Sequence, residues 1–341
     1  MKERKLKQLS DKYYSEGKRL VAPLVGFPGV NFVGTSIKLA QQNYGEHIKV
    51  IKSIVERFQP DVVFPLMDLS VEANAIGRYT LFPQNESATI VTEHFCAEEI
   101  STIENVDVLL DSRLFGYTET MRRMSTSLPK SVMKGSYVTG PYTLAGLLMG
   151  AQNAAMATII NPDELLQICE FTTSVIKKYV NALIENGAQL ICVLEPSAVM
   201  LGPVQFEIFS SNYVKTICEI CDCQEVASVY HICGNSSHLV QKMCEAGIDG
   251  LSLDSHEAGI DMPAIAKEIP SDVVLIGNLN PVGSILNGKP EDIMRDVNNL
   301  LEAMDEFPNY ILSTGCDLPQ EIPLENIDAF MKAGREYRIK N

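Results

Sequence analysis

The strongest constraint on the fold is a series of short apolar runs, each followed by a polar or glycine-rich break and then an amphipathic stretch. The runs are continuously apolar, which is typical of parallel strands that are buried on both faces. Eight such runs occur, at residues 20–25, 61–67, 131–138, 189–194, 226–230, 250–253, 273–276 and 310–312. Eight strand–helix units predict an α/β fold, a single (β/α)8 TIM barrel spanning residues 1–341.

Two stretches depart from the regular pattern. Residues 1–19 precede the first run and are predicted to form an N-terminal helical extension. Residues 77–112 are irregular and punctuated by proline, which predicts an excursion with a short hairpin between strands two and three. Because the pattern is weakest at this point, a doubly wound open sheet is the alternative architecture.

Composition excludes several classes of function. The formal charge of −15 argues against nucleic acid as a partner, since phosphate binding requires a positive face. No apolar stretch reaches the length of a membrane span, and no apolar signal core follows the basic start of the chain. The nine cysteines are scattered and odd in number, which is typical of a reducing compartment. We therefore expect a cytoplasmic protein with no membrane association.

Polar side chains follow the predicted strands directly or within a few residues. In a (β/α)8 barrel the catalytic groups lie at the carboxyl ends of the strands, so groups from different units share one rim. The residues found in these positions are Asp68, Glu195, His231, Cys233, Asp254, Asn278 and Cys316.

His231, Cys233 and Cys316 form the most informative set. On an extended backbone, His231 and Cys233 point to the same side, because they are two residues apart. Imidazole and thiolate are ligands that zinc favours, and Cys316 supplies a third from the last strand. Three protein ligands with an open fourth position form the catalytic type of zinc site. The alternative is that these cysteines are small buried core residues.

Glu195 has two possible roles beside this set. It is predicted either as a fourth zinc ligand in the resting state or as the acceptor that orients His231, and the alternative is a polar loop residue at a strand end. A second cysteine cluster, Cys218, Cys221 and Cys223, has no partner motif, so it is interpreted as structural.

The expected chemistry is transfer of an alkyl group to sulfur. A thiol that occupies the open position loses its proton, because coordination to a cation favours the thiolate. The chain has no H-E-x-x-H motif, so the pattern does not favour a metalloprotease.

The motifs around these residues resemble those of the methylcobamide:coenzyme M methyltransferases, within the uroporphyrinogen decarboxylase superfamily. The resemblance covers roughly residues 61–337 and is carried by five segments: S-V-E-A-N-A-I-G at 70–77, H-I-C-G at 231–234, G-L-S-L at 250–253, G-N at 277–278, and G-C at 315–316 followed by Pro319 and I-P-L-E-N-I at 322–327.

The resemblance implies a function and a set of partners. It implies zinc held by His231, Cys233 and Cys316, and a methyl group taken from the corrinoid of a partner protein. It favours a small thiol such as coenzyme M as the acceptor, with tetrahydrofolate as the alternative. Asp68, Asp254 and Asn278 are expected to bind the cofactor in the cleft. A metal-free lyase of the decarboxylase type and a non-catalytic corrinoid-binding barrel are the rival hypotheses.

Overall fold

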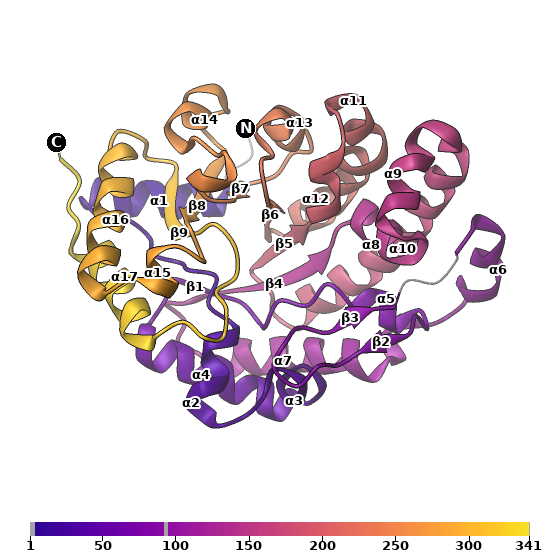
Figure 1. Ribbon diagram of the computed structural model, residues 1–341, viewed down its shortest axis with the longest axis horizontal. Coiled ribbons are helices and arrows are strands. Elements are labelled where there is room, and N and C mark those ends of the chain that lie inside the picture. The colour runs from indigo at the N-terminus through magenta and orange to yellow at the C-terminus, as the bar shows by residue number, and fades with distance from the viewer. Residues whose placement is uncertain (1–3, 92–94, 341) are drawn as a thin grey trace.

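Seven parallel strands form a curled sheet in the computed structural model, which describes residues 4–91 and 95–340 (Figure 1). Their order in the sheet is β1-β4-β5-β6-β7-β8-β9, so consecutive strands of the barrel are neighbours. All seven are parallel to their neighbours and almost wholly buried, as continuously apolar runs predict. The strands are β1 (Val62–Val63), β4 (Met133–Thr139), β5 (Leu190–Leu194), β6 (Ala227–Ile232), β7 (Gly250–Leu253), β8 (Val274–Leu279) and β9 (Tyr310–Thr314).

The segment predicted as the first strand, residues 20–25, closes the barrel between β9 and β1. Its hydrogen bonds to β9 join Ala22 N to Leu312 O (2.8 Å) and Leu312 N to Leu20 O (3.0 Å), and Asp61 N beside β1 donates to Val21 O (3.0 Å). The segment forms an isolated parallel bridge and not a regular strand, because Pro23 has no N–H to continue the ladder. The predicted (β/α)8 barrel is therefore confirmed, and the open sheet is excluded.

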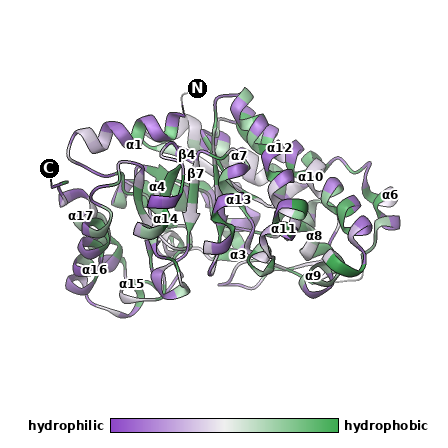
Figure 2. Cartoon of the chain, turned by 90° about the horizontal axis from the view of Figure 1, so that it is seen from above, coloured by the Kyte–Doolittle hydropathy of each residue, from purple (hydrophilic) through white to green (hydrophobic). Residues whose placement is uncertain are grey.

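Helices surround the sheet (Figure 1). Their apolar sides pack on the strands, and Figure 2 shows the hydrophilic outer faces of two of the longer helices, α16 and α17. The α-helices are α1 (Lys5–Ser15), α2 (Val30–Val33), α3 (Ile37–Gln42), α4 (Tyr44–Phe58), α5 (Val71–Ala75), α6 (Ile100–Ile103), α7 (Ser112–Ser127), α8 (Pro141–Met149), α9 (Ala151–Ile160), α10 (Pro162–Glu185), α11 (Pro203–Phe206), α12 (Asn212–Cys223), α13 (Val240–Glu245), α14 (Met262–Glu268), α15 (Ser284–Asn287), α16 (Pro290–Ala303) and α17 (Leu324–Glu336).

Two regions carry elements outside the barrel repeat. Between residues 77 and 112 the chain forms the antiparallel hairpin of β2 (Thr80–Leu81) and β3 (Thr89–Ile90), followed by α6. After α8 the chain forms a further helix, α9, which the sequence pattern did not predict. Gly150 separates the two helices and has a φ of 91°, a conformation that favours glycine. In the described ranges no single helix is long and apolar enough to cross a membrane; α8 and α9 reach that length only together, and they are bent by 106°.

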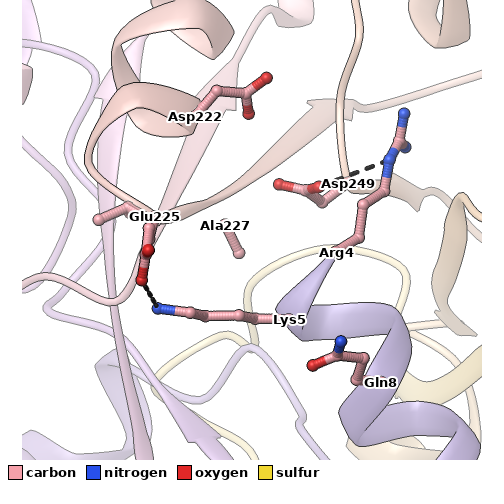
Figure 3. Close-up of a pocket in the computed structure, with 8 residues that line it drawn as sticks. Arg4, Lys5, Gln8, Asp222, Glu225, Ala227 and Asp249 are labelled. Atoms are coloured by element: carbon pink, nitrogen blue, oxygen red, sulfur yellow. Dashed lines mark hydrogen bonds and ion pairs between the residues drawn. The ribbon is translucent and has the colours of Figure 1, made fainter. Parts of the chain in front are cut away.

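Helix α1 packs across the amino ends of the strands, away from the predicted site. Leu6 is fully buried in the barrel interior, and Ser10 Oγ donates to Pro308 O just before β9 (2.7 Å). Lys5 Nζ lies 3.0 Å from Glu225 Oε2, and Arg4 Nε lies 3.7 Å from Asp249 Oδ1 (Figure 3). These contacts border a cavity of about 320 Å³. The N-terminal extension therefore covers one end of the barrel and leaves the other end to the functional groups.

His47 fixes the loop that leaves β1. It lies on α4, is 1% exposed, and its Nε2 accepts a hydrogen bond from Leu66 N (2.8 Å). Its ring packs edge-on against Tyr117 at 5.1 Å between centroids. Burial lowers the pKa of His47 to about 3, so the imidazole is neutral in the folded protein.

We predict that His47 makes the fold sensitive to acid. In the unfolded chain His47 takes up a proton below pH of about 6.5, while the folded protein does not, so its contribution to stability falls as the pH falls. At pH 5 this loss is about 2 kcal/mol. His47→Gln keeps an acceptor for Leu66 N and does not titrate.

The measurement is urea unfolding of both proteins at pH 7.5 and pH 5, which lie above and below the pKa of about 6.5 for histidine in the unfolded chain. His47→Gln should lose about 2 kcal/mol less than wild type on acidification. Equal losses in the two proteins would contradict this role for His47.

Candidate metal centre

The structure brings His231, Cys233 and Cys316 together at the carboxyl end of the barrel. His231 lies on β6, Cys233 directly follows this strand, and Cys316 lies two residues beyond the end of β9. His231 Nε2 is 3.0 Å from Cys233 Sγ and 3.9 Å from Cys316 Sγ, and the two sulfurs are 3.2 Å apart. His231 is buried, whereas both cysteines are partly exposed, so the cluster is accessible from the rim.

Ser252 on β7 orients the imidazole of His231. The two residues face each other in the register of β6 and β7, and Ser252 Oγ lies 2.9 Å from His231 Nδ1. A partner on Nδ1 fixes the ring and its tautomer, so that Nε2 faces the two sulfurs. This is the arrangement in which a histidine is prepared to bind a metal through Nε2.

These three residues fit a zinc ion. Ligands at 2.0–2.3 Å in a tetrahedron are separated from one another by about 3.5–3.8 Å, and the separations in this cluster, 3.0, 3.2 and 3.9 Å, lie around that range. The hydrogen bond to Cys233 and burial both raise the pKa of the Cys316 thiol. Two adjacent thiols cannot both ionise at low cost without a nearby cation, which a metal ion provides.

Asp254 and Asn278 connect the loops that carry the cluster. Asp254 Oδ2 accepts from Gly234 N (2.7 Å), and Asn278 Nδ2 donates to Asp254 O (2.8 Å). Gly315 lies against the same turn: a Cβ on Gly315 would be 2.7 Å from Ser255 N. Asp254 and Asn278 were predicted to bind a cofactor. In the structure they hold together the loops that carry Cys233 and Cys316.

Glu195 makes neither of its predicted contacts. Its oxygens accept hydrogen bonds from Tyr142 N (2.9 Å) and Thr143 N (2.7 Å) in the first turn of α8, and from Ser210 Oγ (2.8 Å). The contact with His231 Nδ1 is made by Ser252 instead. The reason is that the first turn of a helix offers unpaired N–H groups and a positive dipole end, which attract a buried carboxylate.

Asp68 is also occupied by contacts within the protein. Its Oδ1 accepts from Ser70 N (2.9 Å) and Ser70 Oγ (2.6 Å), and its Oδ2 accepts from Arg113 and from Tyr117 Oη (3.1 Å). Arg113 lies on α7, so this network anchors the loop after β1 to a helix. An ionised carboxylate offers about four lone-pair sites, and these contacts use them all. Asp68 therefore has no free acceptor for the predicted role in cofactor binding.

Sequence reasoning missed Asp317, although it directly follows Cys316. Its Oδ1 accepts hydrogen bonds from Gly26 N (3.3 Å) and Leu318 N (3.0 Å), whereas its Oδ2 is buried without a partner in the described structure. Burial raises the pKa of the Asp317 carboxyl to about 7, and the charge of His231 opposes this shift. Adjacency to a predicted ligand was the only signal in the sequence that pointed to it.

A further group of possible ligands lies where the turn at residues 96–99 meets the start of α10. Atoms of Cys96, Glu98 and Glu164 come within 4.8 Å of one another. Glu164 accepts hydrogen bonds from Ala97 N (3.3 Å) and Asn161 Nδ2 (2.6 Å), so this carboxylate serves local structure. Cys218 and Cys221 are buried and Cys223 is exposed, and the three belong to neither group of possible ligands among the described residues; their interpretation as structural stays a prediction.

Comparison with known proteins shows the family. The sequence profile of uroporphyrinogen decarboxylase (URO-D) matches residues 32–337. The chain belongs to the uroporphyrinogen decarboxylase family. The match starts earlier than the 61–337 covered by the motif resemblance, so it includes the segment around α2 to α4.

Relatives within the family include two kinds of enzyme. Methylcobamide:CoM methyltransferase MtbA of Methanosarcina acetivorans is 26% identical over 223 residues, which cover 64% of this chain and 63% of that protein. The same enzyme of Methanosarcina mazei is 25% identical over 71% of this chain and 69% of its own length. Uroporphyrinogen decarboxylase of Prochlorococcus marinus is 26% identical over 82% of this chain and 80% of its own length. The predicted resemblance to the methyltransferases is confirmed.

A solved structure shows the same fold. A methyltransferase from Methanosarcina mazei superimposes with a TM-score of 0.85 at 22% sequence identity, and the match covers 97% of this chain and 98% of that one. At this level of identity the likeness bears on the fold alone. It agrees with the barrel built from β1, β4–β9 and the closing segment.

We predict that Gly315→Ala weakens metal binding. The added Cβ would lie 2.7 Å from Ser255 N and 3.0 Å from Asp254 C, so the loop that carries Cys316 must shift. The expected loss is about 1–3 kcal/mol of stability and at least about ten-fold in zinc affinity. Chelator competition with elemental analysis measures the affinity, and urea unfolding measures the stability.

Gly116→Ala is the matched control. Beyond its chain neighbours and the backbone of its own helix, no heavy atom of the described residues lies within 4 Å of the Cβ position on Gly116, which is in the first half of α7. This variant should be stabilised by about 0.5–1 kcal/mol with unchanged zinc affinity. Equal zinc affinity in Gly315→Ala and wild type would show that the close approach at Gly315 does not position Cys316.

Proposed function

We propose that this chain is a zinc-dependent methyltransferase, which moves a methyl group from a methylated corrinoid protein to the sulfur of a small thiol such as coenzyme M. The observation that carries the proposal is the cluster of His231 Nε2, Cys233 Sγ and Cys316 Sγ within 4.8 Å of one another at the barrel rim. Two of its three members are partly exposed. Membership of the family and likeness to two MtbA proteins support the reaction class.

The residues of the chain have distinct tasks in this reaction. His231, Cys233 and Cys316 would hold the zinc ion, which when bound favours the thiolate form of a thiol at its open position. Ser252 holds the imidazole in place, and Asp254 holds the backbone of the loop after Cys233. The partly exposed sulfurs leave the rim side of the cluster open to the two substrates.

The methyl transfer is a displacement at carbon. The acceptor sulfur forms a bond to the methyl carbon, and the bond between carbon and cobalt breaks. The electron pair of that bond stays on cobalt, so the methyl-Co(III) corrinoid substrate leaves as Co(I). The acceptor proton goes to solvent before the transfer, which is the step that a cationic site favours.

A metal-free decarboxylase is the second candidate. It is favoured by one observation, that the decarboxylase relative matches over 82% of the chain and the first MtbA relative over 64%. A decarboxylase of this kind would not depend on the three residues of the cluster for metal binding. Tetrahydrofolate as acceptor remains a variant of the first proposal, and it differs in using an amine nitrogen as nucleophile.

We predict that Cys316→Ala abolishes both zinc binding and methyl transfer. The wild-type protein should contain about one zinc ion per chain by elemental analysis, and Cys316→Ala much less, because two ligands hold zinc far more weakly than three. Demethylation of methylcob(III)alamin, followed by absorbance with coenzyme M or tetrahydrofolate as acceptor, should fall by at least about a thousand-fold.

Cys223→Ala is the control for this experiment. Cys223 is exposed at the end of α12 and is not part of the cluster. It should retain the zinc content and activity of wild type. A wild-type protein that contains no zinc, or a Cys316→Ala variant with full activity, would eliminate the zinc methyltransferase and favour the decarboxylase.

A further inference from the structure

The exposed apolar side chains of the protein are concentrated at the carboxyl end of the barrel. Among the described residues, every large apolar side chain that is exposed lies in a connection from a strand to the following helix or in the first two turns of that helix. None of them lies at the amino end, which α1 covers on the opposite side from α9 (Figure 2). Exposed apolar patches mark surfaces that another molecule covers. The carboxyl face, which holds the candidate metal centre, is therefore the candidate interaction surface.

Helix α9 is an unusual part of this face. It belongs to a stretch, residues 140–161, that contains no charged residue. A helix that is apolar on all sides is normally buried, yet only two alanines of α9 are buried. Met156 is 47% exposed, and Ile159 and Ile160 are 77% and 76% exposed. These side chains form a surface that is apolar and unpartnered within the described chain.

The connection after β5 adds one more exposed apolar side chain beside α9. Ala151 Cα, at the start of α9, and Ser197 Oγ, in this connection, both lie 3.7 Å from the Cβ position on Gly146 of α8. The two segments therefore approach α8 at the same point. Met200, three residues after Ser197, is 68% exposed. The name apolar patch is used below for Met156, Ile159, Ile160 and Met200.

The same connection borders the loop that carries Cys233. Val199 Cγ2 lies 3.5 Å from the Cβ position on Gly234, which directly follows Cys233. Leu201 O lies 3.0 Å from Nε2 of His238, which is in the connection after β6. The apolar patch is therefore joined by direct contacts to the loop of a predicted zinc ligand.

Carboxylates border the apolar patch. A groove of about 310 Å³ beside α9 is lined by Met156, Ile160 and Glu164, among other residues. Carboxylate oxygens of Glu98 and Glu164 lie within 4.8 Å of each other at this edge. Glu98 and Asp163 are exposed, and Asp163 lies in the first turn of α10 beside Glu164. The surface thus has an apolar centre and a negative edge, which is complementary to apolar side chains flanked by lysine or arginine.

A second copy of this chain is a poor occupant of the surface. In a two-fold contact the same patch meets itself, so Glu98 and Glu164 would approach their own counterparts. In the described strand-to-helix connections of the carboxyl face, lysine and arginine occur only at Lys38, Arg78 and Lys289. With a formal charge of −15, two copies also repel each other. The charges therefore favour a different, basic partner.

We propose that the apolar patch and its acidic edge are the docking site of the protein that carries the methylated corrinoid, and that this protein presents apolar side chains flanked by lysine or arginine. The inference rests on the proposed function, in which that protein is the macromolecular substrate. Its corrinoid must reach the cluster to deliver the methyl group, so the protein around the corrinoid covers the rim beside the cluster. The apolar patch is the part of that rim with an apolar centre, a groove and an acidic edge.

Ile160→Glu tests the docking site. The side chain is 76% exposed, so the substitution leaves the core untouched. The probes are the methylated corrinoid proteins of the cells that make this chain, each purified by its corrinoid absorbance, and free methylcob(III)alamin, which is a donor without a protein. Calorimetry measures binding of each corrinoid protein, and absorbance measures methyl transfer to coenzyme M from each donor.

The expected result is a loss that depends on the protein part of the donor. Ile160→Glu should weaken binding of the corrinoid protein, and raise its KM, by at least about ten-fold, because a charge at the apolar centre loses its water in the complex. The kinetics with free methylcob(III)alamin, the zinc content and the circular dichroism should equal those of wild type. Glu98→Gln should weaken binding by about two- to five-fold and reduce its dependence on salt, since one charge of the acidic edge is removed.

Leu39→Glu is the matched control. Leu39 is 46% exposed on α3, which lies on a different side of the barrel from α9 (Figure 1). The substitution introduces the same side chain and the same charge as Ile160→Glu, so it measures the effect of net charge alone. Its affinity for the corrinoid protein should differ from that of wild type by less than about two-fold.

The outcomes separate this inference from the proposed function. Equal losses in Ile160→Glu and Leu39→Glu, or no loss in either, would overturn docking at α9. So would a wild-type dimer that Ile160→Glu converts to a monomer in light scattering, because the patch would then be a contact between two copies. Methyl transfer from free methylcob(III)alamin by a wild-type protein that binds no corrinoid protein would overturn the docking site and retain the methyltransferase. Binding that Ile160→Glu removes, without transfer from either donor, would overturn the methyltransferase and retain the docking site.

Discussion

Closure of the barrel by residues 20–25 is the interaction on which the candidate site depends. The backbone hydrogen bonds of Leu20 and Ala22 with Leu312 join this segment to β9, and Asp61 joins it to β1. Without them β9 would be an edge strand, and the loop that carries Cys316 would have one side exposed. The same seam holds Asp317 through Gly26. The chemistry of the rim thus relies on pairings between the two ends of the chain.

Within this frame, the loops after β6, β7, β8 and β9 support one another. Asp254 binds the loop of Cys233, Asn278 binds Asp254, and Gly315 packs against the same turn. Asp254 and Asn278 therefore bind backbone groups, and each of their contacts connects two strand ends, whereas Ser252 contacts the side chain of His231. Helix α8 uses Glu195 in a similar way, as a buried carboxylate that satisfies its first turn. Such contacts are of the kind that hold the side chains of a site in place before a ligand binds.

The sequence predicted the structure well where a pattern repeats. It did not predict which of several possible hydrogen-bond partners a single side chain contacts. Continuous apolar runs predicted the barrel, and their strand-end positions placed His231, Cys233 and Cys316 on one rim. The helix α9 (Ala151–Ile160) was not predicted, because Gly150 was interpreted as the end of the preceding helix, a position at which glycine is common. Glu195 was assigned to the metal centre because a strand-end carboxylate looks the same in sequence whether it faces a metal or a helix terminus.

The sequence by itself determined the type of fold, because the period and burial of its strands leave few architectures. It also determined which ligand atoms the chain can offer, since imidazole and thiol groups are fixed by residue type. The tertiary structure alone decided which of these carboxylates have partners: Asp68, Glu195 and Asp254 accept hydrogen bonds, and among the described residues one oxygen of Asp317 accepts none. The physical reason is that hydrogen-bond satisfaction depends on neighbours from distant parts of the chain, which local sequence does not specify.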